Sequence, residues 1–114
     1  MAQADIVSQN DSPQVAMAIP GLYRRTLATG ERMMVCEIFL ERETTVPLHS
    51  HMHEQCGYVL SGKITFTIGE RDYTLLQGDS YSIPGDMPHT ATAHDDTVLV
   101  EVFSPPREEF RIAR

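Results

Sequence analysis

Basic residues are scarce in this chain of 114 residues. Nine Lys and Arg stand against sixteen Asp and Glu, and the formal net charge is −7. Recognition of phosphate groups needs a clustered basic face. A helical membrane span needs about 18 or more consecutive apolar residues, and the sequence contains no such run. We therefore expect neither nucleic acid nor a membrane as a partner.

Cysteine is also scarce. The chain has two cysteines, Cys36 and Cys56, which are too few for a disulfide framework. Residues 1–20 also lack the basic start and the apolar run of a secretory signal. We expect a cytoplasmic protein whose two thiols stay reduced.

No segment keeps a helical period for three turns. Instead, short apolar or alternating segments follow one another between Gly and Pro turns, which is typical of an all-β sandwich or barrel. The length fits one domain, which we place at 22–114, after an N-terminal arm at 1–21 that is interrupted by turn-forming residues. The expected strands are Leu22–Leu27, Met33–Leu40, Gly57–Leu60, Ile64–Ile68, Tyr73–Leu76, Ser80–Ile83 and Thr97–Phe103.

The last of these strands, Thr97–Phe103, is largely apolar on both faces, which indicates burial on both sides. Glu101 shares a face with Leu99 and Phe103, so its carboxylate is expected to point inward. A buried carboxylate is costly unless it is paired or used. The alternative is a slip in strand parity that leaves Glu101 in solvent.

The opposite face of this strand carries three valines, Val98, Val100 and Val102. A small β-domain commonly covers such an apolar face with a second copy of itself. We expect a homodimer, and exchange of residues 1–20 between the protomers is one way of building it.

Histidines carry the chemistry that this sequence suggests. His49, His51 and His53 fall within five residues, and alternate side chains of an extended segment share a face. Imidazoles on one face can bind Zn, Cu, Fe or Ni, although a short His-rich tract also arises without a metal. A third ligand could come from His89, which follows a Gly/Pro turn. By contrast, His94 precedes two aspartates and is expected in a solvated loop.

Two spaced patterns resemble the motifs of the cupins. The first cupin motif, G-x5-H-x-H-x3-E-x6-G, is matched by residues 43–62, and the second, G-x5-P-x-G-x2-H-x3-N, by residues 78–93. The departures are Glu43 and Asp86 for two motif glycines, Ala93 for the Asn and Gln55 for the usual glutamate ligand. The resemblance implies a small antiparallel jelly-roll β-barrel that is open at one end.

The same resemblance implies one divalent metal ion inside the barrel, held by His49, His51, Gln55 and His89. His53 competes with Gln55 because it has the strand parity of the two preceding histidines, but the motif offset favours Gln55. Three imidazoles and an amide are neutral, so the metal would keep its full charge and act as a stronger Lewis acid. They would also stabilise ferric iron less than a carboxylate does, which favours proton transfer over oxygen chemistry. The metal itself stays open between Zn, Ni, Mn and Fe.

A narrower resemblance, to the KdgF-type cupins of pectin and alginate breakdown, is carried by residues 49–55 and 101–108. Those cupins use three His and one Gln on the metal and convert 4,5-unsaturated monouronates into linear 4-deoxy-5-keto uronates. The resemblance implies that Glu101, Phe103 and Arg107 correspond to the family's catalytic carboxylate, Phe and Arg, with Glu101 in place of an Asp. It also implies a small anionic substrate, whose carboxylate Arg107 would bind with its planar fork.

Two other functions fit the sequence. A cupin dioxygenase would hold iron at the same ligands and consume oxygen. A non-enzymatic module would hold the metal and bind a small acid, and the sequence shows no nucleophile beside a base that would indicate covalent catalysis. Proton transfer with ring opening is the first hypothesis, because Glu101 in an apolar setting is suited to exchanging a proton.

Overall fold

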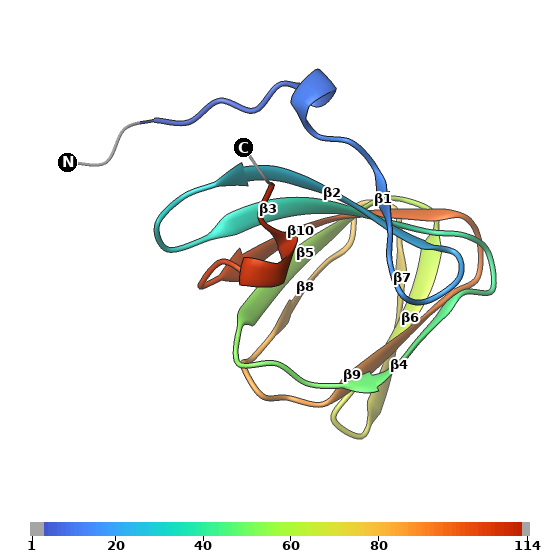
Figure 1. Cartoon of the computed structure of the whole chain (residues 1–114). Helices are drawn as coiled ribbons and strands as arrows, with labels where there is room; N and C mark the ends of the chain where they lie inside the picture. Colours follow the sequence, from blue (N-terminus) through green and yellow to red (C-terminus); the bar gives the residue numbers. More distant parts are fainter. Residues whose placement is uncertain (1–3, 113–114) are drawn as a thin grey trace.

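Two antiparallel sheets make up the fold. The computed structural model describes residues 4–112, which form ten strands and two short 3-10 helices. One sheet has the strand order β1-β2-β3-β10-β5-β8 and the other the order β4-β9-β6-β7 (Figure 1). The elements are η1 (Gln9–Asp11), β1 (Val15–Ala16), β2 (Leu22–Thr29), β3 (Met34–Leu40), β4 (Thr45–His49), β5 (Glu54–Ser61), β6 (Lys63–Ile68), β7 (Arg71–Leu76), β8 (Ser80–Ile83), β9 (His89–Ala93), β10 (Thr97–Ser104) and η2 (Glu108–Phe110).

The predicted all-β jelly-roll class is confirmed. The two sheets face each other as a sandwich, and their hydrogen bonds do not close into one continuous barrel. The last strand, β10, pairs with both β3 and β5 in the middle of the larger sheet. One face of β10 lies in the core, whereas the opposite face, which was expected to be buried as well, is only half-buried.

The core lies between the sheets and follows the alternation expected of strands. β3 and β10 alternate strictly between buried and half-buried residues. Their buried faces belong to one hydrophobic cluster with Ile64 and Phe66 of β6. Glu101 lies on the buried face of β10 with only 5% of its surface exposed, so the alternative that places it in solvent is wrong.

Two strands of the smaller sheet, β4 and β9, lie outside the expected set. β4 contains Pro47, which has no N–H to donate, and its pairing with β9 shifts register between Val46 and His49. β9 has the sequence His-Thr-Ala-Thr-Ala, whose small residues give only weak alternation. β5 also begins at Glu54, three residues before the expected start at Gly57. The prediction of strands was therefore weakest beside the histidines.

The segment at 12–21 packs along the larger sheet instead of standing free as a loose arm. β1 pairs with the start of β2, and the buried Ser12 donates its hydroxyl proton to the carbonyl of Thr26. In return, Nε of Arg25 donates to the carbonyl of Ser12 over 2.9 Å. Gly21 closes the turn into β2 at φ +85°, where a Cβ would collide with a neighbouring side chain. These anchors hold the segment against the domain that follows it.

Within residues 4–112, no helix is long and apolar enough to cross a membrane. Cys36 is buried on β3 and Cys56 is exposed on β5, and both are free thiols.

Candidate metal centre

Three histidines gather at one end of the sandwich. His49 ends β4 and His89 begins β9, and these cross-strand partners have ring centroids 4.2 Å apart. The ring of His51 is 5.7 Å from that of His49 and 5.2 Å from that of His89. One nitrogen of each ring lies within 4.8 Å of the others, which suits a shared metal ion. The sequence predicted that His49 and His51 share a face by strand alternation. Because β4 ends at His49, His51 instead reaches the cluster from the linker before β5.

Backbone carbonyls orient all three rings. Each Nδ1 faces a carbonyl oxygen two residues away along the chain. The partners are Pro47 for His49 at 2.9 Å, His53 for His51 at 3.1 Å and Met87 for His89 at 2.8 Å. A carbonyl only accepts hydrogen bonds, so Nδ1 carries the proton and Nε2 keeps its lone pair. Histidines that bind metals are typically held in this way by an outer partner.

Gln55 adds an oxygen to the cluster. Its Oε1 lies 3.1 Å from Nε2 of His51, and both atoms are acceptors when Nδ1 of His51 is protonated. Burial lowers the pKa of His51, and the charge of Arg107 lowers it further, so an imidazolium that could donate from both nitrogens is disfavoured. Exchanging the oxygen and nitrogen positions of the Gln55 amide would lose a hydrogen bond, because its Nε2 donates to the Glu101 carboxylate. Two lone pairs directed at each other fit a cation between them, so these residues suit a divalent metal.

Glu101 lies directly behind Gln55. Its Oε2 accepts hydrogen bonds from Nε2 of Gln55 and, over 2.5 Å, from the hydroxyl of Tyr81. Gly57 is the cross-strand neighbour of both Glu101 and Tyr81, and a Cβ at Gly57 would lie 2.1 Å from the Tyr81 ring. The missing side chain therefore lets Tyr81 lie over β5 and reach Glu101.

The surroundings of Glu101 and Tyr81 affect the pKa of each group. Burial raises the pKa of Glu101, while the hydrogen bonds from Tyr81 and Gln55 and the charge of Arg107 oppose the rise. Burial, and then the neighbouring Glu101 charge, raise the pKa of Tyr81 well above its usual value. Tyr81 therefore stays a donor, and Glu101 is the group that can exchange a proton. Both hydrogen bonds end on Oε2, so Oε1 has the capacity for a ligand.

Arg107 stands over the aromatic rings of Phe103 and Phe110. Its guanidinium carbon lies 5.1 Å from the ring centre of Phe103 and 4.2 Å from that of Phe110, which are cation–π distances. One Nη donates to a carboxylate oxygen of Glu109 over 3.5 Å, while Nε is buried without a hydrogen-bond partner. The guanidinium therefore keeps donors for an incoming carboxylate.

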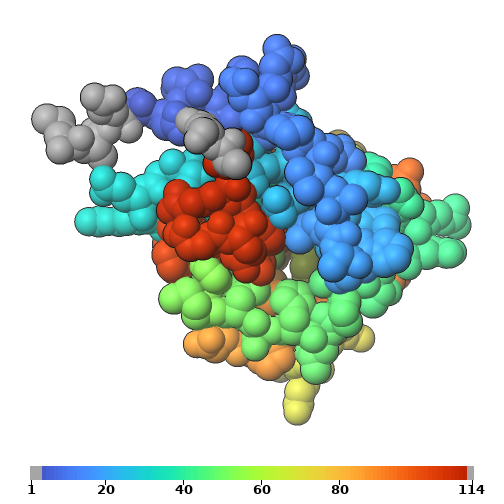
Figure 2. Space-filling model, viewed as in Figure 1, coloured from blue at the N-terminus to red at the C-terminus, as the bar shows by residue number. Residues whose placement is uncertain are grey.

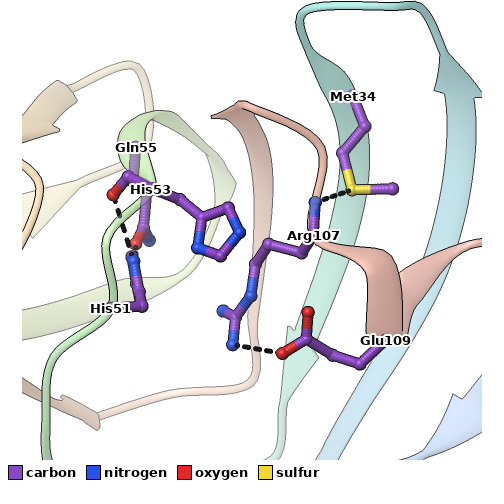
Figure 3. A network of polar contacts seen from close by, with 6 residues as sticks. All are labelled: Met34, His51, His53, Gln55, Arg107 and Glu109. Carbon is purple, nitrogen blue, oxygen red and sulfur yellow. Dashed lines mark hydrogen bonds and ion pairs between the residues drawn. The ribbon is translucent and has the colours of Figure 1, made fainter.

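His53, the competitor of Gln55, lies outside the histidine cluster. Its ring is 5.6 Å from that of His51, and its Nδ1 is buried without a hydrogen-bond partner. Its ring points toward Arg107 in Figure 3, while Gln55 lies against His51. His94 is exposed in the bend after β9, as expected.

A cavity of about 230 Å³ opens beside the cluster. Figure 2 shows the surface hollowed where the N-terminal segment (blue), the C-terminal segment (red) and the chain around β4 (green) meet. The polar lining comprises His49, Gln55, His89, Glu101 and Arg107, and the rest is largely apolar and includes Phe103. The cavity thus brings together all residues that the sequence singled out for the site except His51, which contributes through the cluster.

Residues 37–104 match the Cupin domain family. The chain belongs to the cupins. It is 28% identical over 92 residues to the pectin degradation protein KdgF of Dickeya dadantii, a match that covers 79% of this chain and 84% of that protein. It is also 39% identical over 66 residues to the HTH-type transcriptional regulator PuuR of Escherichia coli, which covers 58% of this chain but only 33% of the regulator.

Solved structures of other cupins have the same fold. An RmlC-like cupin from Shewanella frigidimarina has a TM-score of 0.87 at 25% identity, covering 96% of this chain and 97% of its own. KdgF from Halomonas sp. has a TM-score of 0.87 at 23% identity, covering 96% of this chain and all of its own. These likenesses establish the cupin fold of this chain.

Several residues of the site do not stand out in the sequence. Tyr81 shares strand parity with the apolar Ile83 on β8, which is a signal of its inward position. Met17, Ile19 and Phe110 line the cavity from the two ends of the chain. Those segments have no periodicity that marks an inward face.

Proposed function

We propose that this cupin is a metal-dependent enzyme that converts a 4,5-unsaturated uronate into a linear keto-deoxy uronate by ring opening and proton transfer. The observation that carries the proposal is a buried carboxylate, Glu101, which lines the same cavity as Arg107 and two histidines of the cluster. The similarity to the pectin degradation protein KdgF supports the substrate class.

Each residue has a role that follows from its surroundings. A divalent metal held by His49, His51, His89 and Gln55 would polarise substrate oxygens as a Lewis acid. Arg107 binds the substrate carboxylate through donors that have no partner in the protein. Phe103 supports the guanidinium and forms part of the wall.

Glu101 moves the proton. It takes up the proton of the anomeric hydroxyl while the bond between that carbon and the ring oxygen breaks, which leaves an aldehyde and an enolate. It then delivers that proton to the enolate carbon, so that the enolate becomes a ketone and the carboxylate is restored. The steps together are an isomerisation, with no net gain or loss of atoms or electrons.

Product NMR on lyase-generated unsaturated uronates tests the proposal. The parent protein, loaded in turn with Zn, Ni, Mn and Fe, should form the linear keto product with at least one metal. Glu101→Gln should retain the fold and the metal, because an amide oxygen can accept the same two hydrogen bonds, and turnover should fall by about 10² or more. Glu70→Gln, in an exposed turn, is the control. Untouched sugars under every metal would refute the uronate assignment, and an undiminished Glu101→Gln would refute the role of Glu101.

A second candidate function is a binding module without catalysis. The match to the transcriptional regulator PuuR supports it, because the matched segment is one part of a longer regulatory protein. This function predicts saturable binding of a small acid to the metal-loaded protein, with the acid recovered unchanged. The same NMR spectra separate the two functions.

We also propose a cytoplasmic setting and a single domain at 22–114. The free thiols Cys36 and Cys56 support a reducing compartment. The family match at 37–104 lies wholly within the proposed domain.

A further inference from the structure

The cavity divides into a polar layer and an apolar layer. On β10, one inward-facing step leads from Glu101 to Leu99, and on β9 the same step leads from His89 to Ala91. Such a step of two residues spans about 6.6–6.8 Å. Leu99 and Ala91 both line the cavity, as do the apolar cross-strand partners of Ala91. A ligand that reaches beyond the acid-binding groups therefore meets hydrocarbon.

Met17 and Ile19 add a wall from the N-terminal segment. Both line the cavity and pack against the core, whereas Val15 in the same segment is 43% exposed. The turn that places them is held by hydrogen bonds from the Met17 amide to the Leu22 carbonyl, at 2.9 Å, and from the Leu22 amide to the Ile19 carbonyl, at 3.1 Å. Neither side chain offers a strong hydrogen-bonding group to a ligand hydroxyl.

We propose that the cavity binds a small carboxylic acid whose substituent is apolar, an alkyl chain or an aromatic ring, and that Met17 and Ile19 determine this specificity. The acid group lies at Arg107 and the histidine cluster, so the inference rests on the acid-binding site of the proposed function. It adds a second class of ligand to that site: an unsaturated uronate would occupy the polar layer, whereas an apolar substituent would also fill the layer beyond it. Hydroxyl groups buried against the apolar layer would lose hydrogen bonds to water without replacement, which costs free energy.

The size of the cavity agrees with such a ligand. An apolar cavity of about 150 Å³ in another protein is large enough to bind benzene. At about 230 Å³, this cavity has room for a six-membered ring or a short alkyl chain together with an acid group.

Binding calorimetry on the zinc-loaded full chain tests the inference with pyruvate, 2-oxohexanoate and D-galacturonate. Burial of one methylene strengthens binding about fourfold, and 2-oxohexanoate has three more methylenes than pyruvate. We expect 2-oxohexanoate to bind at least about tenfold more tightly than pyruvate, because partial burial already yields this much. D-galacturonate should bind more weakly than 2-oxohexanoate.

Three variants locate the effect. Ile19→Gln and Met17→Gln should remove most of the advantage of 2-oxohexanoate, measured as the ratio of its affinity to that of pyruvate in the same variant. Val15→Gln, in the same segment but exposed, should keep the full advantage. An advantage that survives in both Ile19→Gln and Met17→Gln overturns the role of the N-terminal segment.

The comparison within the parent protein stands even if a variant does not fold. Equal affinities for pyruvate and 2-oxohexanoate, tighter binding of D-galacturonate, or no binding of any acid overturn the inference, even where unsaturated uronates are converted. A strong effect of chain length without uronate conversion supports the inference and refutes the proposed function.

Discussion

In the proposed function, Gln55 and Glu101 have separate roles at the scale of single residues. Gln55 presents a neutral oxygen to the histidine cluster, and Glu101 holds the amide in place from behind. A neutral ligand leaves the charge of a bound cation undiminished, which strengthens its attraction for anionic oxygens. The buried carboxylate meanwhile stays free of the ligand role and is available for proton exchange.

The guanidinium of Arg107 should determine how strongly a carboxylate substrate binds. Arg107→Ala removes hydrogen bonds to a charged group, which are worth about 1.5–3 kcal/mol, so KM for the uronate should rise roughly 10- to 100-fold. The kcat also falls if the arginine orients the substrate for reaction. Steady-state kinetics measure both values. Arg111→Ala, which breaks an exposed ion pair with Glu108, is the control, and an unchanged KM in Arg107→Ala would contradict this role.

The two cysteines should differ sharply in reactivity. Burial raises the pKa of Cys36 to about 11, whereas Cys56 is exposed. Since the thiolate is the reactive form, an aromatic disulfide reagent at pH 8 should modify one thiol per chain rapidly once the subunits are separated, because Cys56 lies beside Val102 on the face that the predicted homodimer covers. The second thiol should react only after denaturation. Cys56→Ser should abolish the rapid phase. Two rapid thiols, or none after denaturation, would show that these positions are misassigned.

At the scale of elements, the turns that precede the histidines keep a glycine-like backbone without glycine. Glu43 and Asp86 stand where the cupin motifs have Gly, and their φ angles are +71° and +63°. Residues with a Cβ adopt this region at a cost of roughly 1–2 kcal/mol. Glycine would therefore suit both positions better than the residues that stand there.

Glu43→Gly should consequently stabilise the fold slightly, by up to about 1 kcal/mol in the free energy of unfolding, because relief of the positive φ exceeds the added chain entropy. Arg42→Gly, one residue earlier and without a positive φ, should destabilise instead. Denaturant unfolding of the two variants measures the difference. The explanation would be contradicted if Glu43→Gly lowered the free energy of unfolding as much as Arg42→Gly does.

Strands and ligands differ in how far local sequence predicts them. The alternation in Met34–Leu40 and Thr97–Ser104 is visible locally because each strand has a clear apolar face. The histidine spacing likewise marks the site. The contact of Tyr81 with Glu101 was not visible, because it depends on β8 lying beside β5 and on the space above Gly57. Long-range pairing of this kind leaves little trace in a single strand.

At the scale of the whole molecule, the outer face of the larger sheet carries apolar residues on β10 and β5, beside the Arg25–Glu37 ion pair on β2 and β3. Val98, Val100 and Val102 are half-buried there, and the neighbouring Tyr58 and Leu60 of β5 are 44% and 46% exposed. Apolar area of this kind commonly marks a contact between subunits. The placement of the valines agrees with the pattern from which the homodimer was predicted.

The homodimer is tested by light scattering. At micromolar concentration we expect twice the chain mass of 12.8 kDa. Val100→Arg should give the monomer mass, because it places a charge in the middle of the apolar face, while Thr92→Arg on the outer face of the smaller sheet should stay dimeric. A monomer mass for the parent would refute the dimer.

The central claim is that the histidine cluster binds a divalent metal ion, and metal content tests it most directly. The proposed roles of the cavity, of Glu101 and of Arg107 all depend on that bound cation. Elemental analysis of the purified parent protein after metal loading and gel filtration should find one divalent metal ion per chain. His49→Ala removes one of three converging imidazoles, and occupancy should fall to roughly a tenth or less, since the loss of one ligand weakens binding by more than the 10- to 100-fold that outer partners contribute. Full occupancy in His49→Ala, or no metal in the loaded parent, would contradict the account.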